Sequence, residues 1–523
     1  MPKLDNEEIA PVAAERGIYP MRSRLSHGAQ PTSQSSRLTF AVGAGLLAAL
    51  ATYPWWHNVS LWVGAGLAIA MAAVVDIPRA AKQTVPFPHL AILMCTLQYG
   101  LAPWASHYYP SGDYLIADFS RYFAYAGPVL LAVALGWTVS ALGLRSGLTS
   151  GLTTVSGLRS QVSPLLLREL DLLLWGGLAA TYLSSGFSGG GLAFVITLLA
   201  NLRYVGAIGW MILGQPGWKW RLMLVLGYEL VGATGTAMFH DLILWGLSVF
   251  AIYLYLRPMK WSSFMTRFGL LCACIFFLQD AKWTIRSAVW DGSGEVTVFG
   301  SRVEMTRWTQ PLVGILCVLD SGAKLVTSGY SEESLASSTA RFNEGWIIDA
   351  VLRHVPAEEP YARGETIISS VEASLLPRIL APDKLRAGGD ENMERFAGHK
   401  FGGDTSMNIG FAGEMYANFG NWGGILGCGV YALVLGLLFR WIAMRSRTSP
   451  LWWTFAAYAG HWALKAESDI GSVMNYITKA AIVLFGVMLF MPALRAELRG
   501  QITQIRDRSR ERPKAPEHEA VIP

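Results

Sequence analysis

Three stretches in the second half of this 523-residue chain carry the residue types that acid–base chemistry and phosphate recognition need. The first is Arg341-Phe-Asn-Glu-Gly345; the second is Tyr361-Ala-Arg-Gly-Glu-Thr366, which leads to Leu376-Pro-Arg-Ile-Leu-Ala-Pro-Asp-Lys384; the third is Gly413-Glu-Met-Tyr-Ala-Asn-Phe-Gly420. Arginine offers forked donors that match phosphate oxygens, and a carboxylate can take a proton from a hydroxyl group. The stretches therefore predict a site that holds an anionic group and moves a proton.

Glu414 begins the most informative of these patterns, where a long polar segment gives way to an apolar one. Asn418 and Asn421 follow at spacings of four and three residues, so the three side chains share one helix face. We expect Glu414 either to act as an acid or base or to cap or pair with an arginine of the neighbouring loop. The glycines that follow have a small-xxx-small spacing typical of helix packing: Gly420, Gly423, Gly424 and Gly427.

The elements that must position these residues are membrane helices. Hydrophobic residues make up 52% of the chain and charged residues 15%, with a mean hydropathy of +0.34. The apolar residues also fall in blocks of membrane-spanning length. Together these features exclude a soluble enzyme, a disordered scaffold and a secreted mini-protein. The net charge of +5 is too small to suggest a nucleic-acid partner.

The hydrophobic blocks predict an all-α polytopic membrane protein with about twelve transmembrane helices. The candidate spans are residues 38–56, 59–75, 88–105, 122–142, 170–187, 191–213, 221–238, 240–256, 264–280, 410–441, 451–465 and 473–494. Basic residues concentrate in alternate connections, which orients the chain by the positive-inside rule with both termini cytoplasmic. The basic residues of the connections assigned to the inside are Arg79, Lys82, Arg145, Arg159, Arg168, Lys219, Arg221, Arg257, Lys260, Arg267, Arg440, Arg445 and Arg447.

This arrangement divides the chain into five parts. Residues 1–37 are predicted to be a disordered cytoplasmic tail, 38–280 a bundle of about nine helices, 281–408 a large periplasmic loop, 409–494 the C-terminal transmembrane helices and 495–523 a basic cytoplasmic tail. The loop is far longer than a helix connection needs, which favours a functional role. Its apolar stretches at 311–319 and 346–352 predict amphipathic helices.

Taken together, the three stretches and their order resemble the Wzy-type polymerases of O-antigen and exopolysaccharide repeat units. In that family a Pro-Arg-x-x-x-Pro-x-Lys-like segment of the large external loop precedes a Gly-Glu-x-Tyr-x-Asn-Phe-Gly helix start. The resemblance covers residues of about 340 to 430 in motif and the whole chain in layout. It implies a GT-C-like bundle and a metal-independent glycosyltransferase of the bacterial inner membrane, which needs no cofactor.

The resemblance also implies a substrate and roles for individual residues. The enzyme would join saccharides carried on polyprenyl pyrophosphate at the periplasmic side, alongside a chain-length regulator and a flippase. The catalytic candidates are Glu414, Arg378 and Arg341. The substrate-binding candidates are Arg363, Lys384, Tyr361, Tyr416, Asn418, Arg203 and Lys479. The alternative for any single cation is a solvated ion pair with a carboxylate of the loop.

Polar residues inside predicted spans are functional candidates because they are costly in a bilayer. Arg203 and Glu229 lie mid-span in consecutive helices, so we expect them to pair, with phosphate binding by Arg203 as the second interpretation. Lys479 needs a counter-charge or a lipid phosphate. Local salt bridges or packing are the favoured interpretation for His354, His399, His461, Lys465, Glu467 and Asp469. The alternatives are bases at His354 and His399 and a metal pair at Glu467 and Asp469. Asp241 is expected to favour the start of its helix, with a position facing the cavity of Glu414 as the alternative for His240 and Asp241, and Asn475 shares a helix face with Lys479.

Other functional classes are less consistent with the sequence. It contains no phosphate-binding Gly-x-x-x-x-Gly-Lys-Ser/Thr loop and no dinucleotide fingerprint, and no predicted metal site, because Cys272 and Cys274 lack a nearby histidine. A ligase that transfers finished glycan is the near alternative. A secondary transporter would show inverted repeats and broken helices, which the sequence does not show clearly, and an assembly protein with a partner-binding loop is a further alternative.

Overall fold

The computed structural model describes residues 59–112, 114–141, 162–184, 190–290, 294–306, 309–329, 331–375, 389–400 and 407–500. Within this part helices dominate, because a backbone in lipid satisfies its N–H and C=O groups within one helical segment. Six of the described helices are long and apolar enough to cross a membrane: Val59–Ala80, Phe119–Ser140, Ala193–Ile212, Trp261–Arg286, Gly410–Arg445 and Ile470–Phe490. The prediction of a helical membrane protein is confirmed at this level.

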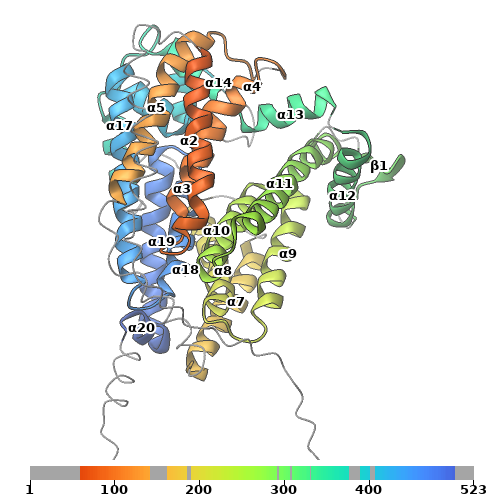
Figure 1. Cartoon of the computed structure of the whole chain (residues 1–523), viewed down its shortest axis with the longest axis vertical. Coiled ribbons are helices and arrows are strands. Elements are labelled where there is room, and N and C mark those ends of the chain that lie inside the picture. Colours follow the sequence, from red (N-terminus) through yellow and green to blue (C-terminus); the bar gives the residue numbers. More distant parts are fainter. Residues whose placement is uncertain are drawn as a thin grey trace, which may run out of the picture.

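Two groups of helices stand side by side in Figure 1. The group on the left contains α2 (Val59–Ala80), α3 (Phe87–Thr96), the single-turn π-helix η2 (Leu97–Leu101), α4 (Ala102–Ala105), α5 (Phe119–Ser140), α17 (Gly410–Arg445), α18 (Trp452–Gly460), the 3-10 turn η3 (His461–Leu464), α19 (Ile470–Phe490) and α20 (Pro492–Leu498). The group on the right contains α7 (Pro164–Ser184), α8 (Gly190–Ile212), α9 (Trp218–Thr236), α10 (His240–Leu256) and α11 (Trp261–Trp290). The described parts of the predicted spans from residue 59 onward are helical, but span 88–105 is divided among α3, η2 and α4 and span 451–465 between α18 and η3. Span 38–56 lies outside the described residues.

The segment predicted as a large loop folds into short elements of its own. It contains the hairpin of β1 (Glu295–Val298) and β2 (Ser301–Glu304), in which Val296 faces Val303. The hairpin is followed by α12 (Gln310–Ser328), α13 (Glu332–Phe342), α14 (Gly345–His354), α15 (Glu365–Leu375) and α16 (Asp390–Ala397). The helices expected at 311–319 and 346–352 fall in α12 and α14. In Figure 1, α13 lies between the two groups of helices.

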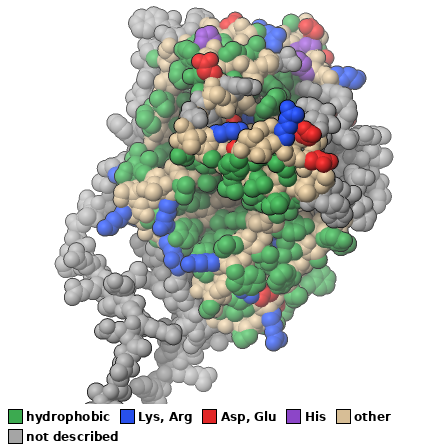
Figure 2. All heavy atoms as spheres, turned by 90° about the vertical axis from the view of Figure 1, so that its right-hand side faces the viewer, with side chains coloured by type: hydrophobic (Ala, Val, Ile, Leu, Met, Phe, Trp, Pro, Cys, Tyr) green, Lys and Arg blue, Asp and Glu red, His purple; other side chains and the backbone are tan. Residues whose placement is uncertain are grey.

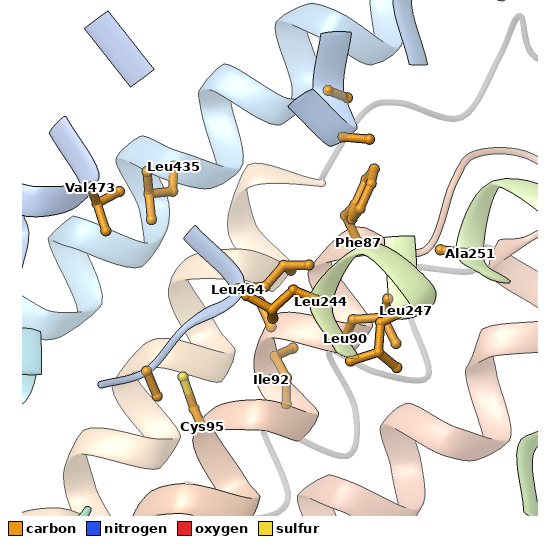
Figure 3. Packing of buried hydrophobic residues seen from close by; sticks show 14 of the residues in the cluster. Phe87, Leu90, Ile92, Cys95, Leu244, Leu247, Ala251, Leu435, Leu464 and Val473 are labelled. Carbon is orange, nitrogen blue, oxygen red and sulfur yellow. The ribbon is translucent and has the colours of Figure 1, made fainter. Parts of the chain in front are cut away.

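Glycine permits the closest helix contacts. A Cβ atom at Gly136 of α5 would lie 2.4 Å from the carbonyl oxygen of Gly429 in α17, and one at Gly206 of α8 would lie 2.4 Å from the carbonyl oxygen of Leu170 in α7. Backbones approach this closely only where a side chain is missing. Larger residues fill the centre, where Figure 3 shows Leu90 and Ile92 of α3 near Leu244 of α10, so α3 and α10 join the two groups.

The helix α17 doubles back on itself at Gly420. The backbone there has φ 69° and ψ −162°, a region that is essentially restricted to glycine. The ring centroids of Phe411 and Tyr431 lie 5.0 Å apart, and a Cβ at Gly427 would meet the Met415 sulfur at 2.5 Å. The predicted span 410–441 is therefore two helical segments, of which the first packs against the second, and the predicted helix-packing role of the glycines is confirmed for Gly427.

Candidate functional site

Glu414 lies in the first segment of α17 and is fully buried. One carboxylate oxygen accepts a hydrogen bond of 2.8 Å from the Thr366 hydroxyl, and the other accepts one of 2.8 Å from the backbone N–H of Ile470. Ile470 is the first residue of α19, where the partial positive charge of a helix N-terminus favours an anion. Both oxygens of Glu414 are thus used to hold α15 and α19 against α17.

Asn418 lies one helical turn after Glu414 and forms hydrogen bonds that join α17 to residues 363–366. Its side-chain carbonyl accepts from Gly364 N–H at 2.8 Å, and its amide donates to the Thr366 hydroxyl at 2.7 Å. The backbone N–H of Arg363 also donates to the backbone carbonyl of Asn418 at 3.1 Å. We call Gly364, Thr366, Glu414, Asn418 and Ile470 the loop junction. Its polar groups are satisfied internally, as buried groups must be.

Other predicted residues surround the loop junction. The rings of Tyr361 and Tyr416 have centroids 6.2 Å apart, and Tyr416 also contacts Tyr125 of α5. Arg363 has a positive φ of 51° and an exposed side chain. The structure therefore brings Tyr361, Arg363, Glu414, Tyr416 and Asn418 together. Arg378 and Lys384 lie outside the described residues.

A second cluster, built from both groups of helices, surrounds Glu467. One carboxylate oxygen of Glu467 accepts from the Gln98 side-chain amide at 3.1 Å, and the other lies 3.0 Å from Nδ1 of His240. Gln98 sits in the π-helical turn η2, a feature that is frequent at functional sites. Its side-chain oxygen accepts from the Ala466 N–H at 3.2 Å, so Gln98 fixes both the backbone and the side chain of this segment.

Three basic side chains gather near this segment, and one of them, Lys282, interacts electrostatically with Glu467. Lys282 and Arg286 lie one helical turn apart on α11, and both are close enough to Arg341 of α13 to repel it electrostatically. The guanidinium carbon of Arg341 lies 5.7 Å from the ring centroid of Trp283 and 6.0 Å from that of Tyr114. Cations that repel one another are stabilised by an anion between them, and the forked guanidinium is suited to phosphate.

Glu344 completes the cluster. It lies at the start of α14, its backbone N–H donates to the Gln98 carbonyl at 3.2 Å, and its carboxyl group is hydrogen-bonded to that of Glu467. Burial, together with the negative charge of Glu467, raises the pKa of Glu344 well above its ordinary value. Burial would also raise the pKa of Glu467, but His240, Lys465 and Gln98 hold that pKa below its ordinary value. In this pair Glu467 ionises first, and Glu344 keeps its proton to a higher pH.

We call this set the charged cluster: Gln98, His240, Asp241, Lys282, Arg286, Arg341, Glu344, Lys465 and Glu467. Lys465 lies 3.7 Å from Asp241, so the predicted local salt bridges of this region are confirmed. The side chains of His240 and Glu467 are 32% and 30% exposed, which leaves them accessible to a ligand. Figure 2 shows Lys, Arg, Asp and Glu side chains in the upper half of one face, with further Lys and Arg side chains lower down and hydrophobic side chains between them.

Arg203 and Lys479, two further charged candidates of the spans, have neighbours outside the loop junction and the charged cluster. Arg203 forms an ion pair with Glu229, which also accepts from the Tyr204 hydroxyl at 3.0 Å, so the predicted pairing is confirmed. The Lys479 ammonium lies 4.7 Å from the ring centroid of Phe194. His354 lies 3.3 Å from Glu358, and the His399 ring contacts Trp346.

Sequence reasoning missed four members of the charged cluster. Glu344 lies within the Arg341 motif but carried no assigned role, and Gln98 lies in an apolar span, where its polarity was the available signal. Lys282 and Arg286 follow the apolar run of α11 at a spacing of four residues, which places both on one helix face. That helix continues to Trp290, ten residues past the predicted boundary at 280, and this extension brings the two cations to Arg341.

Among the described residues, no three His, Cys, Asp or Glu side chains gather closely enough to hold a metal ion. Comparison of the chain with known protein families, with characterised proteins and with solved structures finds no match. The chemistry of the two clusters is therefore the basis for assigning a function.

Proposed function

We propose that this chain is a membrane glycosyltransferase that polymerises polyprenyl-pyrophosphate-linked oligosaccharide repeat units into a surface polysaccharide, an O-antigen or an exopolysaccharide. The observation that carries the proposal is the charged cluster. It combines three cations, an exposed tryptophan and a carboxyl pair at the meeting point of membrane-length helices and the polar segment. An amphiphilic substrate with a diphosphate group matches this combination.

The chemistry of polymerisation requires two functions that the cluster can supply. As the bond between the sugar and the diphosphate breaks, negative charge develops on the diphosphate, and fixed cations stabilise it. The acceptor hydroxyl gives up a proton, and an ionised carboxylate such as Glu467 can receive it. Holding both lipid-linked saccharides at one place contributes further by proximity. The buried hydrogen bonds of Glu414 favour a positioning role for that residue over proton transfer.

The proposal also includes the arrangement in the cell. The chain would cross the bacterial inner membrane about twelve times as a GT-C-like bundle, with cytoplasmic termini and with residues 281–408 in the periplasm. Arg363, Arg378 and Lys384 would assist in binding the saccharide or the diphosphate, and a flippase and a chain-length regulator would act before and beside it. The basic residues of alternate connections support this orientation.

The test is complementation of a deletion strain, with the polysaccharide analysed on gels and the membrane level of each variant measured. We expect Lys282→Ala, Arg286→Ala and Arg341→Ala each to lower polymer yield about tenfold or more, because each removes a basic group that can bind the diphosphate, and to accumulate single repeat units. Lys324→Ala is the matched control, since Lys324 is exposed and paired with Asp320 on α12. Normal polymer in all three variants at normal protein levels would refute the proposal.

A secondary transporter is the second candidate, and one observation favours it. The helices α3, α17 and α18 are interrupted at η2, Gly420 and η3, and transporters bind substrate at interrupted helices. The same deletion strain separates the candidates. A transporter would leave the polysaccharide profile unchanged, and a ligase would leave intact polymer that is not attached to its acceptor.

A further inference from the structure

The outward face of α12 is apolar, although the sequence predicts that this helix belongs to a loop in the aqueous periplasm. Leu312, Leu319 and Val326 follow one another at a spacing of seven residues, which places them in one stripe along the helix. Their side chains are 63%, 57% and 83% exposed. A continuous exposed apolar surface marks contact with another molecule or with a membrane, so the surroundings of this stripe need to be identified.

The opposite face of α12 is buried against the membrane helices. Val313 and Cys317 belong to one hydrophobic cluster with Ala233 of α9 and Ile285 of α11. Figure 1 shows α12 on the side of α9 and α11 that faces away from the other group of helices. The packing of Val313 and Cys317 fixes how the helix is rotated about its axis. The apolar stripe therefore points away from α9 and α11, toward whatever surrounds the protein.

Two contacts fix the level of α12 along these helices. A Cβ atom at Gly314 would lie 2.6 Å from that of Thr234 in α9, and one at Gly322 would lie 3.5 Å from the Phe277 ring in α11. Thr234 and Phe277 each lie sixteen residues after the start of their helix. They are thus about 24 Å from the helix ends that the basic residues assign to the cytoplasm. Since the hydrocarbon core is about 30 Å thick, α12 stands level with the outer leaflet.

The surface next to α12 belongs to a helix of membrane-spanning length. The segment Trp261–Arg286 of α11 is long and apolar enough to cross a bilayer, and its side chains Leu270 and Phe276 are exposed on the protein surface. In a membrane these side chains contact lipid. Because α12 packs against α11 with its stripe outward, the apolar surface continues from α11 onto α12. The acyl region of the membrane is one medium that covers both.

We propose that α12 is an interfacial helix that lies in the outer leaflet, with the stripe of Leu312, Leu319 and Val326 against phospholipid acyl chains. Helices of this kind bury their apolar face about 5–10 Å into the boundary between headgroups and acyl chains. Lys324 lies toward the end of α12 and pairs with Asp320 at 2.8 Å, and a long lysine side chain can extend its ammonium to the polar side of this boundary. The lipid contact is separate from the proposed activity and does not depend on it.

The test measures the surroundings of the stripe with nitroxide spin labels on the full-length protein in liposomes of phosphatidylethanolamine and phosphatidylglycerol. The five native cysteines are replaced by serine or alanine, and single labels are attached in Leu312→Cys, Leu319→Cys and Val326→Cys. Leu270→Cys, on the span of α11, is the lipid reference, and Arg302→Cys, exposed on β2, is the water reference. We expect the stripe to match Leu270, with high accessibility to oxygen and an accessibility to a water-soluble nickel chelate at least fivefold lower than at Arg302.

Two results would overturn the inference. Accessibility of the stripe to the nickel chelate equal to that at Arg302 would show that the stripe faces water. An immobile label with low accessibility to both reagents would show that protein covers the stripe, either a second copy of this chain or another partner.

The unmodified chain gives an independent measurement in isolated inner-membrane vesicles, where other membrane proteins are present. A phosphatidylethanolamine with a diazirine in its acyl chain should label peptides of α12 as well as those of α11. Labelling of α11 without labelling of α12 would overturn the inference, and it would leave the proposed function unaffected because no diphosphate is involved.

Discussion

At the scale of single residues, the hydrogen-bonded carboxyl groups of Glu344 and Glu467 define the protonation state of the charged cluster. His240, Lys465 and Gln98 all contact or face Glu467 and favour its ionised form, whereas Glu344 has the neighbouring carboxylate and burial acting against ionisation. The two acids therefore have different roles. Glu467 ionises first and can receive a proton, whereas Glu344 keeps its proton to a higher pH and can donate a hydrogen bond to Glu467.

We expect Glu344→Gln to be tolerated and Glu467→Gln to lose activity, because glutamine resembles a protonated carboxyl group and removes only the charge that Glu467 needs. The measurement is polymer yield in the complemented deletion strain, with protein level as the control. Equal loss in both variants would contradict the assignment of the proton to Glu344.

The same pair predicts a pH dependence of stability. A carboxyl group whose folded pKa is raised contributes stability that is fully present below its unfolded pKa, near 4.5, and is lost as the pH rises through the folded value. Wild type should therefore lose thermal stability relative to Glu344→Gln as the pH rises from 4.5 through the folded pKa of Glu344, with no further difference above it. Unfolding temperatures of both proteins in detergent measure this, and parallel curves would contradict it.

At this scale the sequence indicated Arg341 and its motif as candidates, but not the residues that surround Arg341. Arg341 can be identified from the sequence because it lies in a motif whose residue types are suited to binding an anionic group. Its neighbours are distant in the sequence: Lys282 lies 59 residues before Arg341, Arg286 lies 55 before it and Gln98 lies 243 before it. They come close to Arg341 only through tertiary packing. Nothing in local spacing can report such a contact, since it depends on where α11 ends and on how η2 turns Gln98 toward the segment of Glu467.

At the scale of elements, the loop junction joins α15, α17 and α19 through one carboxylate and one amide. Both carboxylate oxygens of Glu414 accept a hydrogen bond, one from the Thr366 hydroxyl and one from the first N–H of α19. The Thr366 hydroxyl in turn accepts from the Asn418 amide. Such fully satisfied buried networks fix how elements pack, and removing one member leaves the others unpaired.

We predict that Glu414→Ala destabilises the protein by about 1–3 kcal/mol, since it leaves the Thr366 hydroxyl and the Ile470 N–H without an acceptor. Glu414→Gln retains one acceptor oxygen and should recover much of this loss, together with polymer yield. Thermal unfolding and membrane protein level measure the effect. If Glu414→Gln folded normally but made no polymer, Glu414 would be a catalytic acid or base instead of a positioning residue.

Helix positions were largely predictable from the sequence, because hydrophobic runs of membrane length leave the backbone few alternatives to a helix. The break at Gly420 was not. Glycine was expected there for helix packing, and in part it serves packing, but nothing in the spacing of Gly420, Gly423 and Gly424 distinguishes a straight helix with a small-residue face from a reversal. The reversal is seen only in the folded chain, where Gly420 has a positive φ and the ring of Phe411 packs against that of Tyr431.

At the scale of the whole molecule, the charged cluster lies where the two groups of helices meet. It draws Gln98 and Glu467 from one group, His240 and Lys282 from the other, and Arg341 and Glu344 from the polar segment. A site assembled from three parts of the chain exists only when all three are in place, so the proposed activity depends on the complete fold.

The proposed orientation can be measured with engineered cysteines and a membrane-impermeant maleimide. We expect Glu358→Cys, at a position whose side chain is 74% exposed, to react in spheroplasts. Arg445→Cys, exposed at the end of α17, should react only after the membrane is opened. The wild-type chain, with its own five cysteines, is the control for background labelling. The reverse pattern would overturn the orientation inferred from the basic residues.

The loop junction also has a consequence for biosynthesis. Glu414 and its partner Ile470 are 56 residues apart, so at a translation rate of about 5–20 residues per second the carboxylate is made roughly 3–11 s before the N–H group that it binds. During this interval the first segment of α17 holds a carboxylate without its full set of hydrogen bonds beside the membrane. The first segment of α17 can pack against α5 and α15, which are made earlier, but the hydrogen bonds of the loop junction are completed only after the start of α19 has emerged from the ribosome.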